Sequence, residues 1–82
     1  MSRYFLHLRD GTEEILDPEG TEHANMEALR KFVLNSVRDL FCGDVKNGLV
    51  DFRFRVDAEN EAGAIVYSLP FKHAFNIIPD AA

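Results

Sequence analysis

Four side chains have the chemistry for nucleophilic, acid–base or metal-ligand roles: His7, His23, His73 and Cys42. No two of them lie three or four residues apart, and the paired spacing of tetrahedral zinc sites is absent. Cys42 is expected near the C-terminal end of a helix, where the helix dipole disfavours a thiolate. We therefore expect no catalytic residue, no metal site and no cofactor.

Sequence motifs of known enzyme classes are also absent. The chain has no nucleophile elbow, no zinc-protease motif and no glycine-rich phosphate loop. His7, between Leu6 and Leu8, is the one side chain for which several roles stay open: a buried hydrogen-bonded histidine, an exposed pH-sensitive group, or a general base beside a carboxylate from a neighbouring turn. A small enzyme that uses His7 is therefore an alternative hypothesis.

The composition is that of one small globular domain. The chain has 82 residues, of which 46% are hydrophobic and 28% charged, so we expect a single domain spanning residues 1–82. One cysteine cannot form an internal disulfide, and it fits a reducing compartment. No apolar run approaches the roughly 20 residues of a membrane span, and no signal-peptide core follows Met1. We expect a cytoplasmic protein without membrane contact.

The net charge of −5 is unevenly distributed along the chain. Segment 10–22 contains acidic residues and no Lys or Arg; the acids are Asp10, Glu13, Glu14, Asp17, Glu19 and Glu22. Basic residues outnumber acids in the middle of the chain. A net acidic chain lacks the positive field on which phosphate binding depends, so nucleic acid is not the favoured partner.

The first secondary-structure unit is predicted to be a hairpin. Residues 3–9 are rich in aromatic and aliphatic side chains and stop at Asp10-Gly11, a strong hairpin-turn signal. Residues 14–16 form a short second strand. The chain then turns at 17–20, where Pro18 presets φ and Gly20 accepts a positive φ.

A long amphipathic helix follows. Asn25 can accept hydrogen bonds from the first free N–H groups, residues 26–42 contain no Gly or Pro, and Gly43 sits where a left-handed residue would end the helix. Apolar and small side chains recur at helical spacing and predict one buried face; they are Leu29, Phe32, Val33, Ser36, Val37 and Leu40.

Two more strands complete the predicted fold. Residues 52–57 alternate strictly between apolar and polar side chains, residues 58–63 form a turn, and residues 64–69 form a strand that Pro70 ends. Residues 71–78 add a helical turn or an extended tail that covers a core edge with Phe71, Phe75 and Ile77. The order ββαββ predicts an α+β fold: one amphipathic helix packed on a four-stranded antiparallel sheet, with strand order 2-1-3-4.

One face of this sheet is expected to stay uncovered. If Tyr4, Leu6 and Leu8 face the helix together with Ile65, then the opposite face combines aromatic, imidazole and guanidinium groups and contains no acid. We expect this face to bind a partner, through Phe5, His7, Arg9, Arg53, Arg55 and Val66, with Ser68 beside them.

These features favour a small non-enzymatic interaction module that self-associates or binds another protein through its open sheet face. A homodimer would form by contact of the Phe5/Val66 face or by pairing of edge strands. The alternative from another class is binding of single-stranded nucleic acid, with Phe and His side chains stacking on bases and Arg side chains contacting phosphates.

The chain also resembles a known family. The residues that carry the resemblance are the opening segment 3–11, the turn 17–20, the helix start 27–30 and the closing Ser68-Leu69-Pro70-Phe71. They are similar to a family of short bacterial proteins, chiefly alphaproteobacterial, classed as a domain of unknown function. The resemblance implies a compact single-domain bacterial protein and carries over no catalytic residue, cofactor or partner. Lys72-His73 stands where the family pattern has a polar acid.

Overall fold

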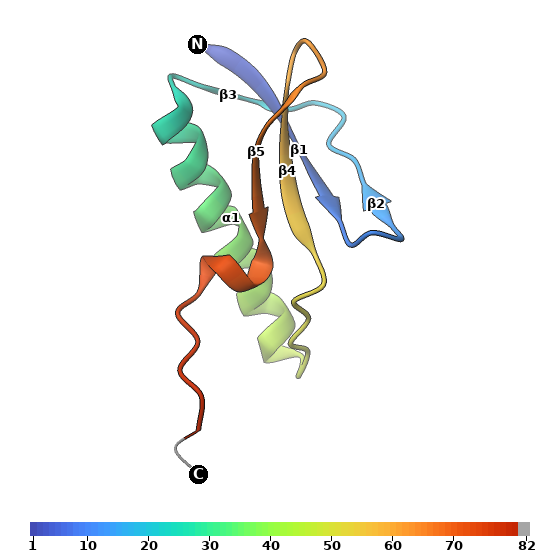
Figure 1. The fold of residues 1–82 in the computed structure, drawn as a ribbon, viewed down its shortest axis with the longest axis vertical. Coiled ribbons are helices and arrows are strands. Elements are labelled where there is room, and N and C mark those ends of the chain that lie inside the picture. The colour runs from blue at the N-terminus through green and yellow to red at the C-terminus, as the bar shows by residue number, and fades with distance from the viewer. Residues whose placement is uncertain (81–82) are drawn as a thin grey trace.

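The structure, a computed structural model, describes residues 1–80. Its elements in chain order are β1 (Ser2–Arg9), β2 (Glu14–Ile15), β3 (Thr21–His23), α1 (Met26–Lys46), β4 (Arg55–Asn60), β5 (Ile65–Pro70) and a 3-10 turn η1 (Phe71–Ala74). Figure 1 shows α1 lying along one face of the sheet. The predicted α+β class, with one helix on an antiparallel sheet, is confirmed.

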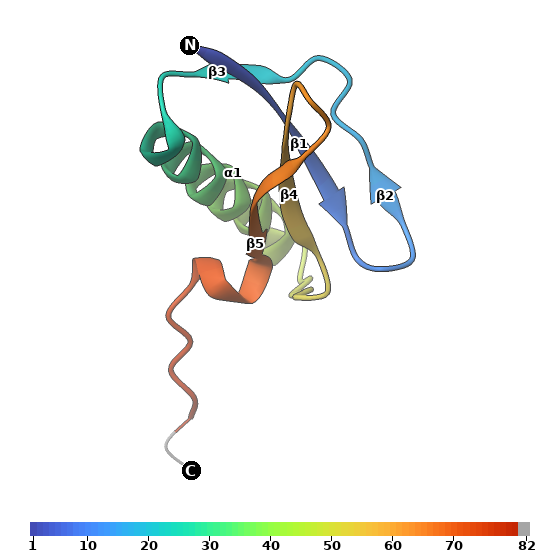
Figure 2. The ribbon, with the colours of Figure 1, turned by 45° about the horizontal axis from the view of Figure 1, so that its top comes forward.

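The sheet runs β2-β1-β4-β5 with antiparallel neighbours, which is the predicted order of the four main strands. A fifth strand, β3, was not predicted: it pairs with the first half of β1, on the edge whose second half pairs with β2. Three residues are too few to display an alternation, so β3 is specified by its partner strand rather than by its own sequence. Figure 2 shows β2 and β3 along this edge.

Helix α1 begins as predicted and ends later. Asn25 Oδ1 accepts a hydrogen bond from Ala28 N at 2.8 Å, which confirms the N-cap. The helix passes through Gly43 and ends at Lys46, with Asn47 as C-cap and Gly48 at φ +79°. Gly43 is therefore an ordinary helical residue, and Gly48 supplies the left-handed conformation that follows the helix.

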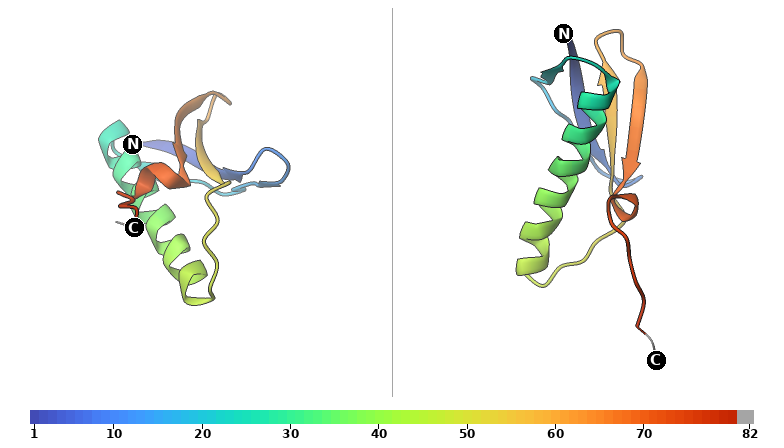
Figure 3. Two further views of the ribbon diagram at one scale, coloured as in Figure 1. Left: turned by 60° about the horizontal axis from the view of Figure 1, so that its bottom comes forward. Right: turned by 90° about the vertical axis from the view of Figure 1, so that its left-hand side faces the viewer.

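The core lies between α1, β4, β5 and η1. One helical stripe, Leu29, Val33 and Val37, is fully buried, as predicted, whereas Phe32 and Leu40, predicted on the same face, are exposed. It packs against side chains of the sheet and the 3-10 turn, which are Val56, Ala58, Leu69, Phe71 and Ala74. Figure 3 shows α1 and η1 on the same side of the sheet. No helix within residues 1–80 is both long and apolar enough to span a bilayer.

The strand predicted at 52–57 is displaced along the chain. Pairing begins at Arg55 and continues to Asn60 through residues that had been predicted to turn. Phe52 and Phe54 do pack against the core as expected, but through aromatic contacts: Phe52 stacks on Phe41 with ring centroids 5.1 Å apart. Pairing with β1 extends β4 through Ala58, Glu59 and Asn60.

A register shift in β5 exchanges the sheet faces on which Ile65 and Val66 lie. Ala58 lies opposite Tyr67 and Glu59 lies opposite Ile65, so Val66 is an extra residue on its strand. An inserted residue reverses the alternation of side chains beyond it. Val66 consequently packs against the core, and Ile65 is exposed. The predictions that Val66 lies on the open face and that Ile65 faces the helix are both wrong.

The chain ends in a helical turn followed by an extended tail. Phe71 and Ala74 of η1 are buried, and Phe75 packs against the core cluster. Ile77 remains exposed, contrary to its predicted covering role, because the tail that follows η1 runs away from the sheet (Figure 1).

Candidate functional site

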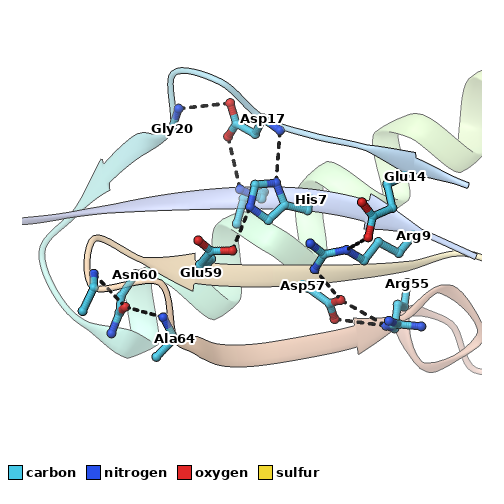
Figure 4. Close-up of polar contacts among 12 residues, drawn as sticks. His7, Arg9, Glu14, Asp17, Gly20, Arg55, Asp57, Glu59, Asn60 and Ala64 are labelled. Atoms are coloured by element: carbon cyan, nitrogen blue, oxygen red, sulfur yellow. Dashed lines mark hydrogen bonds and ion pairs between the residues drawn. The ribbon is translucent and has the colours of Figure 1, made fainter. Parts of the chain in front are cut away.

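The sheet face opposite α1, here called the open face, carries most of the predicted binding residues. His7 and Arg9 of β1 lie beside Asp57 and Arg55 of β4 in register, so their side chains emerge on the same side of the sheet. Figure 4 shows these groups on β1 and β4, with Glu14 of β2 beside Arg9. The expectation of a face without acid is wrong, since Asp57 and Glu59 continue the alternation that begins at Arg53 and Arg55.

Asp57 is the centre of the open face. The residue is only 4% exposed, and its carboxylate accepts hydrogen bonds from Arg9 Nη1 at 3.0 Å, Arg55 Nε at 3.2 Å and Ser68 Oγ at 2.6 Å. Arg9 and Arg55 are direct cross-strand partners, an arrangement that like charges disfavour. The Asp57 carboxylate between them offsets that repulsion.

The electrostatic balance at Asp57 favours the ionised form. Burial raises the pKa of the Asp57 carboxyl, but hydrogen bonds from Ser68, Arg9 and Arg55 outweigh burial and hold its pKa below the ordinary value of 3.8. The group is therefore a carboxylate at neutral pH. A second carboxylate, that of Glu14, contacts Arg9 Nε at 2.9 Å, so the Arg9 guanidinium has acidic partners on two sides.

His7 is held by two partners as well. Its Nδ1 accepts a hydrogen bond from Asp17 N at 3.2 Å, and its Nε2 lies 3.2 Å from Glu59 Oε2. Because Nδ1 accepts, this geometry assigns the imidazole proton to Nε2, which donates to Glu59. Both ring nitrogens are thus engaged within the chain, and the ring is buried. Of the roles left open for His7, the buried hydrogen-bonded histidine fits these contacts.

The turn at 17–20 closes over one edge of the open face. Asp17 Oδ2 accepts from Leu6 N at 3.1 Å, and Oδ1 accepts from Glu19 N and Gly20 N at 3.2 and 3.0 Å. The carboxylate thereby fills the gap between β2 and β3 on the edge of β1. Burial raises the pKa of Asp17, yet these backbone hydrogen bonds keep it below its usual value.

Gly20 brings this turn into contact with Phe5. At φ +72°, a Cβ added to Gly20 would lie 2.7 Å from the Tyr4 carbonyl oxygen and 3.0 Å from two carbons of the Phe5 ring. Phe5 is therefore on the open face as predicted, but its ring lies against the 17–20 turn and is half-buried. The chain itself supplies part of the cover for this aromatic side chain.

Arg53 lies outside the strands. Its guanidinium pairs with Asp51, with Nη2 2.9 Å from Oδ2, and the side chain is exposed. The contact with Arg53 lowers the pKa of Asp51 to about 2. Of the six predicted binding residues, the structure brings Phe5, His7, Arg9 and Arg55 to the open face, and it places Arg53 and Val66 elsewhere.

Four acidic residues of this site were not predicted as site residues: Glu14, Asp17, Asp57 and Glu59. For Asp57 and Glu59 the signal was available, because they follow Arg53 and Arg55 at intervals of two residues. The strand had been predicted to end at Asp57, with residues 58–63 as a turn, so Glu59 was not placed on the sheet. Asp17 had been assigned only to the turn, and its contact with Leu6 depends on tertiary structure.

A hollow of about 440 Å³ lies beside this network, lined by Arg9, Gly11, Thr12, Glu13, Glu14 and Arg55. Its arginines are already paired with Asp57, and His7 is not among the lining residues. Within residues 1–80, no three His, Cys, Asp or Glu side chains are grouped so as to hold a metal ion. The open face is thus a polar surface whose charges are satisfied by one another.

Comparison with known families gives one match: the family described as Domain of unknown function (DUF6894) matches residues 3–72. The chain belongs to this family. The DUF6894 match runs from β1 into η1 and includes every residue of the open-face network. Searches of curated proteins and of solved structures gave no significant match.

Proposed function

We propose that this DUF6894 protein is a non-enzymatic interaction module that self-associates through the outer edge of β5. The observation that carries the proposal is the character of that edge. β5 is the last strand of the sheet, with β4 as its only strand neighbour among residues 1–80. Its sequence, Ile-Val-Tyr-Ser-Leu-Pro, has no charged side chain, whereas each of the other strands has at least one.

The opposite edge of the sheet is protected. There the edge of β1 is divided between two short strands, β2 and β3, and the Asp17 carboxylate satisfies Leu6 N in the gap between them. Short strands, charges, β-bulges and Pro at an edge all hinder pairing with another chain. β5 is six residues long and uncharged, with a register shift at one end and Pro70 at the other, so its middle residues are the part that stays open to pairing.

The backbone of β5 has N–H and C=O groups that point away from β4 and are free to bond to another strand. Phe71 N donates a hydrogen bond to Phe54 O. In an antiparallel pair of strands, every second residue forms backbone hydrogen bonds to its cross-strand partner. Counting back from Phe71, Leu69 and Tyr67 are therefore the residues of β5 whose backbone groups bond to β4. Ser68 lies between them, so its N–H and C=O point outward. Pro70 is the next residue that faces outward, and because it has no N–H it offers a partner strand only its C=O.

A second copy of the chain is the partner that this edge fits best. Two β5 strands related by a two-fold axis are antiparallel and present the same uncharged edge to each other. An isologous contact therefore forms without placing like charges opposite one another. The open face offers less, because its arginines and His7 already have partners within the chain. The same pairing of Arg9, Arg53 and Arg55 with carboxylates supports a protein partner over a nucleic acid.

The cytoplasm is the proposed location. Cys42 is an exposed free thiol, which is stable in a reducing compartment and prone to oxidation outside one.

The test is the oligomeric state of an edge variant. Light scattering coupled to gel filtration, over a series of concentrations, should give a mass that rises from one chain to two. Ile65→Lys places a charge on the β5 edge, where Ile65 is 47% exposed and lies opposite Glu59, so the variant should stay folded. We expect the dimer to dissociate at concentrations at least about tenfold higher than for the wild type.

The matched control is Ile15→Lys, the same substitution on the opposite edge of the sheet. It should leave the concentration dependence of the mass unchanged. A wild-type mass of one chain at every concentration would contradict self-association, and equal effects of the two variants would contradict the β5 edge as its site.

A further inference from the structure

His7 is buried on the open face with a backbone N–H as one of its partners. The residue is 8% exposed, and its Nδ1 accepts a hydrogen bond from Asp17 N at 3.2 Å. On the other side of the ring, Nε2 lies 3.2 Å from Glu59 Oε2 (Figure 4). A neutral imidazole with its proton on Nε2 satisfies both contacts, because it accepts at one nitrogen and donates at the other.

Protonation of His7 is incompatible with one of these contacts. An imidazolium has an N–H on both nitrogens. Its Nε2–H keeps the Glu59 carboxylate as acceptor, in a charge-assisted hydrogen bond. Its Nδ1–H would face the Asp17 N–H, so two donors would oppose each other in a buried position, where an unmade hydrogen bond is costly. Protonation therefore retains the Glu59 contact and removes the Asp17 contact.

The other charged groups around His7 keep their charge when the imidazole titrates. Asp57 is the cross-strand partner of His7 on β4, and Arg9 follows on the same face of β1 and pairs with Asp57 at 3.0 Å. Burial raises the pKa of the Asp57 and Asp17 carboxyls, but hydrogen bonds keep both below 3.8, so both stay ionised at neutral and mildly acidic pH. Histidine is the type of side chain that changes charge between about pH 8 and about pH 5. A pH change across this range therefore acts on His7.

The contact between His7 and Asp17 holds more than one residue, because Asp17 organises the 17–20 turn. Asp17 Oδ2 accepts from Leu6 N at 3.1 Å, and Oδ1 accepts from Gly20 N at 3.0 Å. Gly20 in turn lies against the half-buried Phe5 ring. An imidazolium Nδ1–H without an acceptor competes with these backbone groups for the Asp17 carboxylate, since a charged donor forms the stronger bond.

We propose that the 17–20 turn is a pH-sensitive cover over Phe5, which neutral His7 holds closed and protonated His7 opens. Opening uncovers the Phe5 ring and frees Leu6 N in the gap between β2 and β3. An aromatic ring and an unpaired strand N–H then become accessible on a face whose charges are otherwise satisfied by one another. The cover is independent of self-association at β5, which lies at the other edge of the sheet.

His23, the second buried histidine, has a partner that adapts to protonation. The residue is 8% exposed, and its Nε2 lies 2.8 Å from the Thr21 hydroxyl oxygen. A hydroxyl both donates and accepts, so the Thr21 hydroxyl accepts from a protonated ring after a rotation of its own proton. This contact of His23 therefore requires no movement of the backbone when the ring titrates.

The test is an NMR titration of the full chain between about pH 8 and about pH 5. Histidine ring signals report protonation, and amide exchange, corrected for the intrinsic effect of pH, reports opening of the turn. We expect the protection of the Asp17 and Gly20 amides to fall at least about tenfold as His7 is protonated. The Phe5 ring signals should shift with the same midpoint, and the Leu69 amide, bonded to β4, should keep its protection.

Variants assign the transition to His7. In His7→Asn, the side-chain oxygen replaces Nδ1 as acceptor from Asp17 N and does not titrate, so the turn should stay closed across the range. His73→Asn, the same substitution at an exposed histidine, is the matched control and should leave the transition in place. Glu59→Gln, at a side chain that is 30% exposed, removes the charge that attracts the imidazolium and should move the transition at least about 0.5 unit to lower pH.

Three results would overturn the proposal. They are unchanged protection of Asp17 and Gly20 over the range, a transition that persists in His7→Asn, and a transition that leaves Phe5 unaffected. If His7→Asn does not fold, Glu59→Gln decides, and a transition at the wild-type pH in that variant would exclude His7 as its cause.

Discussion

Asp57→Ala is expected to destabilise the protein by about 3 kcal/mol, measured as the free energy of unfolding in urea. Removing one member of a buried ion pair leaves its partners uncompensated and costs about 3 to 5 kcal/mol. The lower end applies here, because Arg9 keeps Glu14 as a partner and the Arg55 side chain is 45% exposed to water. Ser68 also loses its acceptor.

Asp51→Ala is the matched control, since Asp51 also pairs with an arginine, but with one that is exposed. It should change stability little. A loss for Asp57→Ala as small as that for Asp51→Ala would contradict the central role assigned to Asp57.

The Asp57 carboxylate also contributes to the decrease in the free energy of unfolding at acid pH. Its folded-state pKa lies below 3.8, so its contribution is complete above that pH and is lost as the pH falls through the folded-state value. The Asp57→Ala variant should therefore lose less stability than the wild type below pH 3.8.

Gly20→Ala should also be destabilising by about 3 kcal/mol, again measured by urea unfolding. The positive φ of +72° costs an L-residue about 1 to 2 kcal/mol. The new Cβ would in addition lie 2.7 Å from the Tyr4 carbonyl oxygen, a backbone atom that cannot rotate away, and overpacking of this kind costs about 1 to 3 kcal/mol.

Gly11→Ala separates the two contributions. Gly11 has a φ of +93°, and nothing lies within 4 Å of its added Cβ, so it should show the backbone cost alone, about 1 kcal/mol. If the two alanine variants were equally stable, the close approach of the 17–20 turn to β1 would be wrong.

Much of the fold was predictable from local signals. Asp10-Gly11 predicted the first turn, Asn25 the helix start, and the apolar spacing of Leu29, Val33 and Val37 the buried face of α1. These features depend on residues close together in sequence, where periodicity and capping act directly. The strand order followed from the number of elements and short connections.

The candidate site was less predictable, because its contacts are between distant segments. Asp57 and Arg9 are 48 positions apart, and Asp17 and Leu6 meet only once β2 and β3 have both paired with β1. Ile65 and Val66 lie on the faces opposite to those predicted because one residue is inserted in β5. A prediction from strict alternation assumes that no residue is inserted, so it cannot detect this shift. Alternation placed Arg55 correctly and would have placed Asp57 and Glu59 as well.

The most direct test of self-association at the β5 edge is amide hydrogen exchange at Ser68, followed by NMR at several protein concentrations. In a single chain the Ser68 N–H points away from β4, and in a β5-paired dimer it is hydrogen-bonded. We expect its exchange to slow as concentration rises, while Leu69, bonded to β4 in either state, serves as the internal reference. A Ser68 exchange rate that is the same at every concentration would contradict the account.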